Sequence, residues 1–142
     1  MTEKIIFACI GNSCRSQMAE AFAKQFLPSD CIIISAGTRP ASEINPLAVI
    51  VMEEIGYDMS NQYPKKLTTA MLSGTTRFIS MGCGVLESCP VPIARGTLAV
   101  EDWSLEDPVG KDISFFREIR GQIEHQVTVL ATELEQGRCS CP

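Results

Sequence analysis

Apolar residues along the chain fall alternately into short runs and into helical spacings. The short runs, which are rich in β-branched residues, predict strands at residues 4–9, 31–35, 77–81 and 97–100. The helical spacings predict helices between them, at residues 16–27, 46–55 and 67–72. Strands that alternate with helices are typical of an α/β fold, in which a parallel sheet carries helices on both faces.

The last predicted helix has the clearest pattern. Its apolar residues recur at steps of 3, 4, 4, 3 and 4, and they are Phe116, Ile119, Ile123, Val127, Leu130 and Leu134. Polar residues fill the opposite face, which favours a monomer. Earlier in the chain, Asn45 and Pro46 are typical of a helix start, and Gly56 is typical of a helix end.

Composition and charge narrow the class of protein. The 142 residues fit one domain, and 45% hydrophobic with 20% charged residues argues against disorder. The net charge is −5 and the chain has no basic stripe, which argues against nucleic-acid and membrane partners. The apolar run near the N-terminus is too short for a signal peptide or a membrane span, so we expect a cytoplasmic protein.

The loop after the first strand has the composition of an anion site. Ligands of parallel sheets bind beyond the carboxyl ends of the strands, and this loop leads directly into a helix N-terminus, which attracts anions. Gly11 and Asn12 tolerate positive φ, and Arg15 offers a planar fork for two oxygens of a tetrahedral oxyanion. The expected oxyanion-binding loop consists of Ile10, Gly11, Asn12, Ser13, Cys14, Arg15 and Ser16.

Cys9 stands at the entrance of this loop. The positive field of the loop and the helix N-terminus favours a thiolate, and Ser16 is placed to donate a hydrogen bond to the sulfur. We therefore interpret Cys9 as a nucleophile. The alternative is a buried cysteine that happens to end a strand.

The chain contains seven cysteines, and an odd number excludes a fully paired disulfide framework. Cys83 and Cys89 are open to three interpretations: small buried residues, half of a zinc site, or a redox pair. Because His125 is the single histidine, zinc is disfavoured and we expect no metal. We assign Cys14 and Cys31 to packing.

Residues 9–20, CIGNSCRSQMAE, resemble the anion loop of arsenate reductases built on the low-molecular-weight tyrosine phosphatase fold. Further matching segments follow in order at residues 35–37, 45–46, 58–60, 81–83, 88–90, 101–103 and 106–111. The resemblance implies a three-layer α/β/α fold with a four-stranded parallel sheet. It covers a catalytic domain that we place at residues 1–135. Residues 136–142 form a tail that holds Cys139 and Cys141, to which we assign no role.

The resemblance also implies a mechanism. Cys9 attacks arsenate, Arg15 clamps the oxyanion, and Asp107 protonates the departing oxygen as general acid. Cys83 then attacks Cys9 and arsenite leaves, after which Cys89 attacks Cys83 and moves the disulfide to Cys83–Cys89. Thioredoxin or a related thiol reductant would reduce that pair, and no cofactor is implied.

Two alternatives remain at this stage. A phosphatase acting on phosphomonoesters would also use Cys9, Arg15 and Asp107. The phosphatases, however, place tyrosines after the Asp-Pro pair, where this chain has Val109 and Gly110, and this difference favours a small inorganic oxyanion. A non-catalytic oxyanion sensor that keeps the loop is the other alternative.

Some thioredoxin-coupled members of the family bind a potassium ion beside the loop asparagine. Asn12, Glu20 and Ser35 match that ligand set, but Lys65 stands about where an aspartate ligand would be. A lysine ammonium can replace the charge of the cation, so we expect activity and stability that do not depend on potassium.

Overall fold

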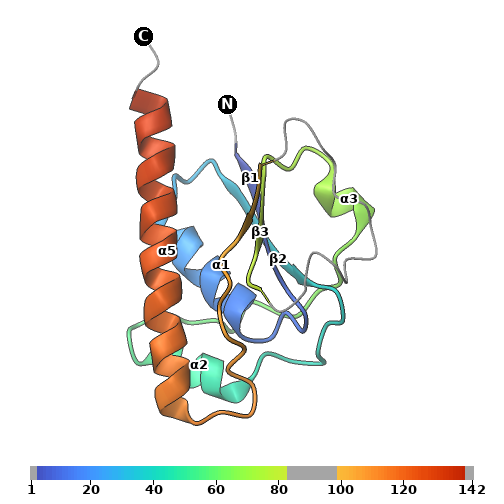
Figure 1. Ribbon diagram of the computed structural model, residues 1–142, viewed down its shortest axis with the longest axis vertical. Coiled ribbons are helices and arrows are strands. Elements are labelled where there is room, and N and C mark those ends of the chain that lie inside the picture. Colours follow the sequence, from blue (N-terminus) through green and yellow to red (C-terminus); the bar gives the residue numbers. More distant parts are fainter. Residues whose placement is uncertain (1–2, 83–98, 140–142) are drawn as a thin grey trace.

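Four parallel strands lie side by side in the computed structural model, which describes residues 3–82 and 99–139 (Figure 1). Within these ranges the strand order is β2-β1-β3-β4. The strands are β1 (Lys4–Cys9), β2 (Ile32–Gly37), β3 (Arg77–Ser80) and β4 (Ala99–Asp102). The helices are α1 (Arg15–Phe26), α2 (Pro46–Glu53), α3 (Thr69–Leu72) and α5 (Ile113–Cys139).

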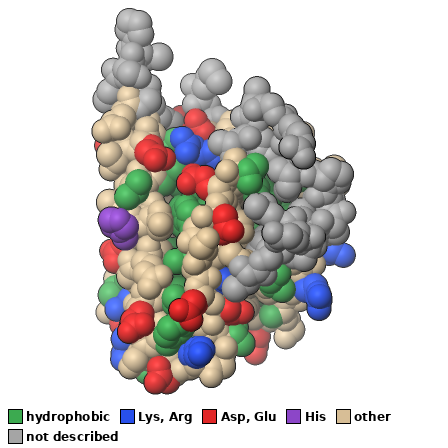
Figure 2. Space-filling view, in the orientation of Figure 1, with side chains coloured by type: hydrophobic (Ala, Val, Ile, Leu, Met, Phe, Trp, Pro, Cys, Tyr) green, Lys and Arg blue, Asp and Glu red, His purple; other side chains and the backbone are tan. Residues whose placement is uncertain are grey.

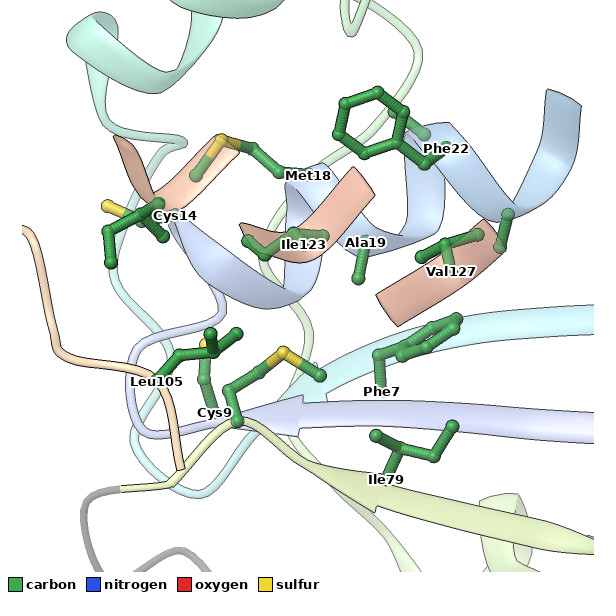
Figure 3. Packing of buried hydrophobic residues seen from close by; sticks show 14 of the residues in the cluster. Phe7, Cys9, Cys14, Met18, Ala19, Phe22, Ile79, Leu105, Ile123 and Val127 are labelled. Atoms are coloured by element: carbon green, nitrogen blue, oxygen red, sulfur yellow. The ribbon is translucent and has the colours of Figure 1, made fainter. Parts of the chain in front are cut away.

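One hydrophobic cluster lies on each face of the sheet, and strand β1 contributes side chains to both clusters. Alternate residues of a strand point to opposite faces. Phe7 belongs to the larger cluster, which lies under α1, α2 and α5, whereas Ile6 packs with Leu67 and Phe78 on the α3 side (Figures 1 and 3). The three-layer arrangement with a four-stranded parallel sheet is therefore confirmed.

The order of the strands places the loop after β1 near the middle of the edge formed by the carboxyl ends of the strands. From β1 the chain moves to β2 on one side, and it later returns to β3 on the other side of β1. Such a reversal opens a crevice at the carboxyl ends of the strands. Cys9, the last residue of β1, is paired with Gly37 of β2 and lies at this point.

The periodic elements agree with the sequence pattern. All six apolar residues predicted to form the inner face of the last helix are 5% exposed or less. The Asn45 side chain caps α2 by accepting a hydrogen bond from the Leu47 N–H at 2.9 Å, and Gly56 adopts a φ of 87° just after the helix. Charged side chains of both signs are interspersed on the face formed by α5 and β4 (Figure 2). In the part of the chain that is described, no helix is long and apolar enough to cross a membrane.

Several predicted boundaries are wrong by one or two residues. The first helix begins at Arg15 and not at Ser16, and β2 runs from Ile32 to Gly37 because its partner β1 extends to Cys9. The fourth strand is Ala99–Asp102 and not 97–100. Its polar residues are tolerated because β4 lies at the edge of the sheet, where Glu101 forms an ion pair with Arg77 at 3.7 Å. Helix α5 continues to Cys139, so it includes the first residues of the predicted tail; the division into domain and tail stays a prediction.

Candidate active site

The loop between β1 and α1 is held from outside by the segment that follows β2. Backbone N–H groups of Arg39, Ala41 and Asn45 donate to the carbonyls of residues 10, 11 and 13 at 2.8, 2.9 and 2.9 Å. On the opposite side, the N–H of Asn12 points at the Cys9 Sγ at 3.1 Å. The loop thus turns carbonyls outward and an amide donor inward, which is the polarity that an anion-binding nest requires.

Gly37 allows β2 to end against this loop. A Cβ at this position would lie 2.6 Å from the Ile10 carbonyl oxygen and 2.9 Å from the Asn12 nitrogen. Neither backbone atom can move without disturbing the loop, so a side chain here is excluded on steric grounds. Gly37 lies in one of the segments that resemble the family, and this close approach is the physical reason for a glycine there.

Cys9 is buried, and its sulfur lies in a set of hydrogen-bond partners. Its Sγ is 2.8 Å from the Ser16 Oγ, as predicted, in addition to the contact with the Asn12 N–H. As a thiolate, the sulfur accepts from both donors, and charge-assisted hydrogen bonds of this kind stabilise the anion. The interpretation of Cys9 as a strand-end packing residue does not account for these donors.

The Asn12 side chain links the loop by hydrogen bonds to Ser16 and to Lys65. Of the two loop residues noted as tolerating positive φ, Asn12 adopts it, with a φ of 49°, and Gly11 does not. The Asn12 Nδ2 donates to the Ser16 Oγ at 2.7 Å, and its Oδ1 accepts from the Lys65 backbone N–H at 2.8 Å. The loop conformation therefore depends on a residue far along the chain.

Arg15 is 2% exposed and is anchored by the loops after β3 and β4. Its Nη1 donates to the carbonyls of Leu105 at 2.9 Å and Met81 at 3.3 Å, and its Nη2 lies 3.8 Å from the Asp107 carboxylate. The structure thus brings Arg15 and Asp107 together at the carboxyl end of the sheet. The Asp107 carboxylate also accepts a hydrogen bond from the Val109 N–H at 3.1 Å, and this bond stabilises the turn at residues 107–109.

Cys14 and Cys31 differ in burial. Cys14 is 2% exposed, and burial raises the pKa of its thiol from the usual 9.0 to about 12, although a hydrogen bond to Ser13 partly opposes the shift. Cys14 is therefore a neutral, buried thiol in the same hydrophobic cluster as Cys9 (Figure 3). Cys31 is only half buried and packs at the border of the core, one residue before β2 begins.

Cys83 and Cys89 lie outside the described residues. The described chain leads toward them through Gly82, whose φ is 107°. A Cβ on Gly82 would be 3.1 Å from the Ser104 Cα, so this glycine permits a close approach to the loop that carries Asp107. The entry to the Cys83 segment is therefore at the same end of the sheet as Cys9.

A buried carboxylate lies behind the loop. Glu20 accepts from the Ser35 hydroxyl at 2.5 Å, and its oxygens lie 2.5 Å from the Lys24 ammonium and 3.8 Å from that of Lys65. Burial lowers the pKa of Lys65, and Glu20 opposes that shift. Two ammonium groups already face this carboxylate, so the residues do not fit an added potassium ion. Among the described residues, no three His, Cys, Asp or Glu side chains gather to hold a metal.

Two glutamines that support the site, Gln17 and Gln62, were not predicted from the sequence. Gln17 is fully buried, and its Nε2 donates to the Asn12 carbonyl at 2.9 Å, to the Asn12 Oδ1 at 3.0 Å and to the Tyr63 carbonyl at 3.0 Å. Gln62 donates to the carbonyl and to the side-chain oxygen of Gln17. One signal was available: Gln17 is a polar residue directly before Met18 and Ala19, which are apolar residues of the same predicted helix.

A sequence model described as low molecular weight phosphotyrosine protein phosphatase matches residues 4–139. A protein named glutaredoxin arsenate reductase from Synechocystis sp. is 37% identical over 134 residues, which cover 93% of this chain and 98% of that protein.

Two solved structures are similar over most of the chain. A thioredoxin-dependent arsenate reductase from Corynebacterium glutamicum has a TM-score of 0.80 at 31% identity, covering 96% of this chain. This chain spans 63% of the length of that protein. A structure described as an arsenate reductase in the phosphate binding state has a TM-score of 0.78 at 36% identity, covering 92% of this chain and 98% of the other.

Proposed function

This chain belongs to the low molecular weight phosphotyrosine protein phosphatase family, and from that premise we propose that it reduces arsenate to arsenite. The observation that best supports this proposal is the position of the Cys9 Sγ, which lies 2.8 Å from the Ser16 Oγ and 3.1 Å from the Asn12 N–H. A thiolate held in this way is ready to attack a tetrahedral oxyanion. Relatives named arsenate reductase, together with the additional cysteines of this sequence, favour arsenate as that oxyanion.

The first step joins sulfur to arsenic. Cys9 attacks arsenate, an As–O bond breaks, and Asp107 gives its proton to the departing oxygen, which leaves as water. The Arg15 guanidinium, anchored by the Leu105 carbonyl, neutralises the oxyanion. The product of this step is a Cys9–arsenate thioester with arsenic still in its oxidised form.

The second step transfers two electrons. Cys83 attacks the Cys9 sulfur, a Cys9–Cys83 disulfide forms, and the bonding pair of the S–As bond stays on arsenic, which leaves as arsenite. Cys89 then attacks Cys83, which releases the Cys9 thiolate and leaves a Cys83–Cys89 disulfide. A dithiol protein of the thioredoxin class supplies two electrons and two protons to reopen it. The cytoplasm, where thiols are kept reduced, suits this cycle.

The test is a single turnover of reduced protein with arsenate, followed by trapping of thiols and mass spectrometry. We expect one arsenite per protein and the loss of two hydrogens from the Cys83–Cys89 pair. Cys83→Ser should block arsenite release, whereas Cys89→Ser should release one arsenite and stop as a Cys9–Cys83 disulfide. Normal multiple turnover by both variants would exclude the relay.

Phosphate-ester hydrolysis is the second candidate function, because the family description names a phosphatase and the loop suits either oxyanion. Val109, which follows the Asp-Pro pair, is 54% exposed and offers no aromatic wall for a phosphotyrosine ring. Rapid hydrolysis of p-nitrophenyl phosphate that persists in Cys83→Ser, without arsenate reduction, would favour the phosphatase. Arsenate binding without turnover in a full reducing system would favour a sensor.

The identity of the reductant and the oligomeric state are tested separately. We propose a thioredoxin-type dithiol and a monomer, since polar side chains cover the outer face of α5. Multiple turnover should require thioredoxin with its reductase, and glutathione with glutaredoxin should not replace them. Light scattering during size-exclusion chromatography should give the mass of one chain.

A further inference from the structure

Gln17 is a fully buried polar side chain that the reaction steps do not use. It lies in the first turn of α1, next to the nucleophile's partner Ser16. Its two amide hydrogens serve three oxygens: the Asn12 carbonyl, the Asn12 Oδ1 and the Tyr63 carbonyl. Because this buried amide donates all its hydrogen bonds to Asn12 and to the Tyr63 carbonyl, it holds both residues in place.

The two bonds to Asn12 act on different parts of that residue. One fixes its backbone carbonyl and the other fixes its side-chain amide, so together they hold Asn12 at its left-handed φ of 49°. This conformation directs the Asn12 N–H to the Cys9 Sγ and the Asn12 Nδ2 to the Ser16 Oγ. Both hydrogen-bond partners of Cys9 therefore depend on the orientation of Asn12.

A second glutamine holds Gln17 from the other side. The Gln62 Nε2 donates to the Gln17 carbonyl at 3.0 Å and to its Oε1 at 2.9 Å. This contact leaves the Gln17 Nε2 turned toward Asn12, because the oxygen of the same amide is occupied by Gln62. The segment 62–65 also reaches the loop directly through the Lys65 N–H on the Asn12 Oδ1.

We propose that Gln17 is a positioning residue for the Cys9 nucleophile, oriented in turn by Gln62. Gln17 acts through Asn12, which it keeps in the conformation that supplies hydrogen bonds to the thiolate directly and through Ser16. The inference rests on the proposed function only in that Cys9 is the reacting thiol. It adds two residues of the chain to those that determine the reactivity of that thiol.

The experiment measures Cys9 alkylation rather than arsenate reduction. Reduced full-length protein is treated with iodoacetamide across pH, and the Cys9 peptide is quantified by mass spectrometry. In Gln17→Met the rate at pH 7 should fall by about ten-fold, because fewer donors stabilise the thiolate. Gln25→Met, on the exposed side of the same helix, should react like the unchanged chain.

Folding is measured in parallel by circular dichroism and thermal denaturation. A purely structural Gln17 would lower the melting temperature and leave the Cys9 rate of the folded protein unchanged, and that result would overturn the proposal. If Gln17→Met does not fold, the test moves to Gln62→Leu at a half-exposed position, where we expect a roughly three-fold slower reaction at pH 7. An unchanged rate in folded Gln62→Leu would then overturn it.

Failure of this inference and failure of the proposed function give different results. If arsenate is not reduced by the unchanged chain, the proposed function fails, but the alkylation rates still report on Gln17. If arsenate is reduced and folded Gln17→Met alkylates at the unchanged rate, the function stands and the positioning role is wrong.

Discussion

The Arg15 guanidinium lies 3.8 Å from the Asp107 carboxylate, although these residues belong to the first helix and to the loop after the last strand. Arg15 is almost completely buried, whereas Asp107 is 45% exposed. The arginine is therefore held in place by its contacts with the protein, whereas the Asp107 carboxylate is partly open to solvent. This contact brings together the two residues that we propose as the oxyanion clamp and the proton donor.

Replacing Asp107, the proposed proton donor, should slow the first chemical step. In Asp107→Asn we expect the single-turnover rate of arsenite release to fall by about a hundred-fold to ten-thousand-fold, because general acid catalysis is lost. Arsenate affinity, measured by calorimetry, should be retained, since Arg15 keeps its anchors on Leu105 and Met81. The neighbouring exposed Glu106→Gln is the control and should retain the rate. Equal rates for both variants would remove Asp107 from the mechanism.

A side chain at Gly37 should disturb the loop. Because its Cβ would lie 2.6 Å from the Ile10 carbonyl, Gly37→Ala should lower the free energy of unfolding by about 1–3 kcal/mol. The matched control is Gly121→Ala in α5, where a Cβ meets nothing within 4 Å. That change should raise the free energy of unfolding by about 0.5–1 kcal/mol, because alanine is the better helix former. Urea denaturation measures both, and a stabilised Gly37→Ala would contradict the steric argument.

Potassium should have no effect on the unchanged protein. Since Lys65 and Lys24 already place positive charge beside Glu20, replacing potassium by choline at constant ionic strength should leave melting temperature and turnover the same. In Lys65→Gln one ammonium is removed, and we expect a lower melting temperature that potassium partly restores. A marked stabilisation of the unchanged chain by potassium would show that the ammonium groups do not replace the cation.

An ion-pair cluster between α2 and α5 should make stability depend on pH. Hydrogen bonds from Arg117, then from Arg120, lower the pKa of Glu54 from its usual 4.5 to about 2. Because the folded pKa is the lower one, the stabilisation is complete above pH 4.5 and is lost as pH falls toward 2.

Glu54→Gln should therefore lower the urea midpoint at pH 7, and its difference from the unchanged protein should shrink as pH falls from 4.5 to 2, where Glu54 is protonated in the unfolded chain and about half protonated in the folded chain. Added salt should reduce the difference at pH 7, since the cluster is exposed. Glu53→Gln, at the adjacent exposed position, is the control. A difference that persists unchanged at pH 2 would exclude the ion pairs as its cause.

Local patterns determined most of the secondary structure. The apolar spacing of α5 predicts its buried face residue by residue, and Asn45 predicts the start of α2, because helix periodicity and capping depend on near neighbours. The candidate residues of the loop could also be predicted from the sequence, since Cys9, Asn12 and Arg15 lie within one short segment. Asp107 entered through resemblance to a family and not through spacing.

The sequence by itself determined an α/β chain, and it predicted an oxyanion-binding loop after the first strand. Only the tertiary structure decided what holds that loop: Gly37 of β2 against its backbone, Gln17 and the Lys65 N–H on Asn12, and the Leu105 carbonyl on Arg15. The physical reason is that these contacts join segments distant in sequence. Hydrophobic periodicity records which face of an element is buried, but it does not record which polar group meets which across the fold.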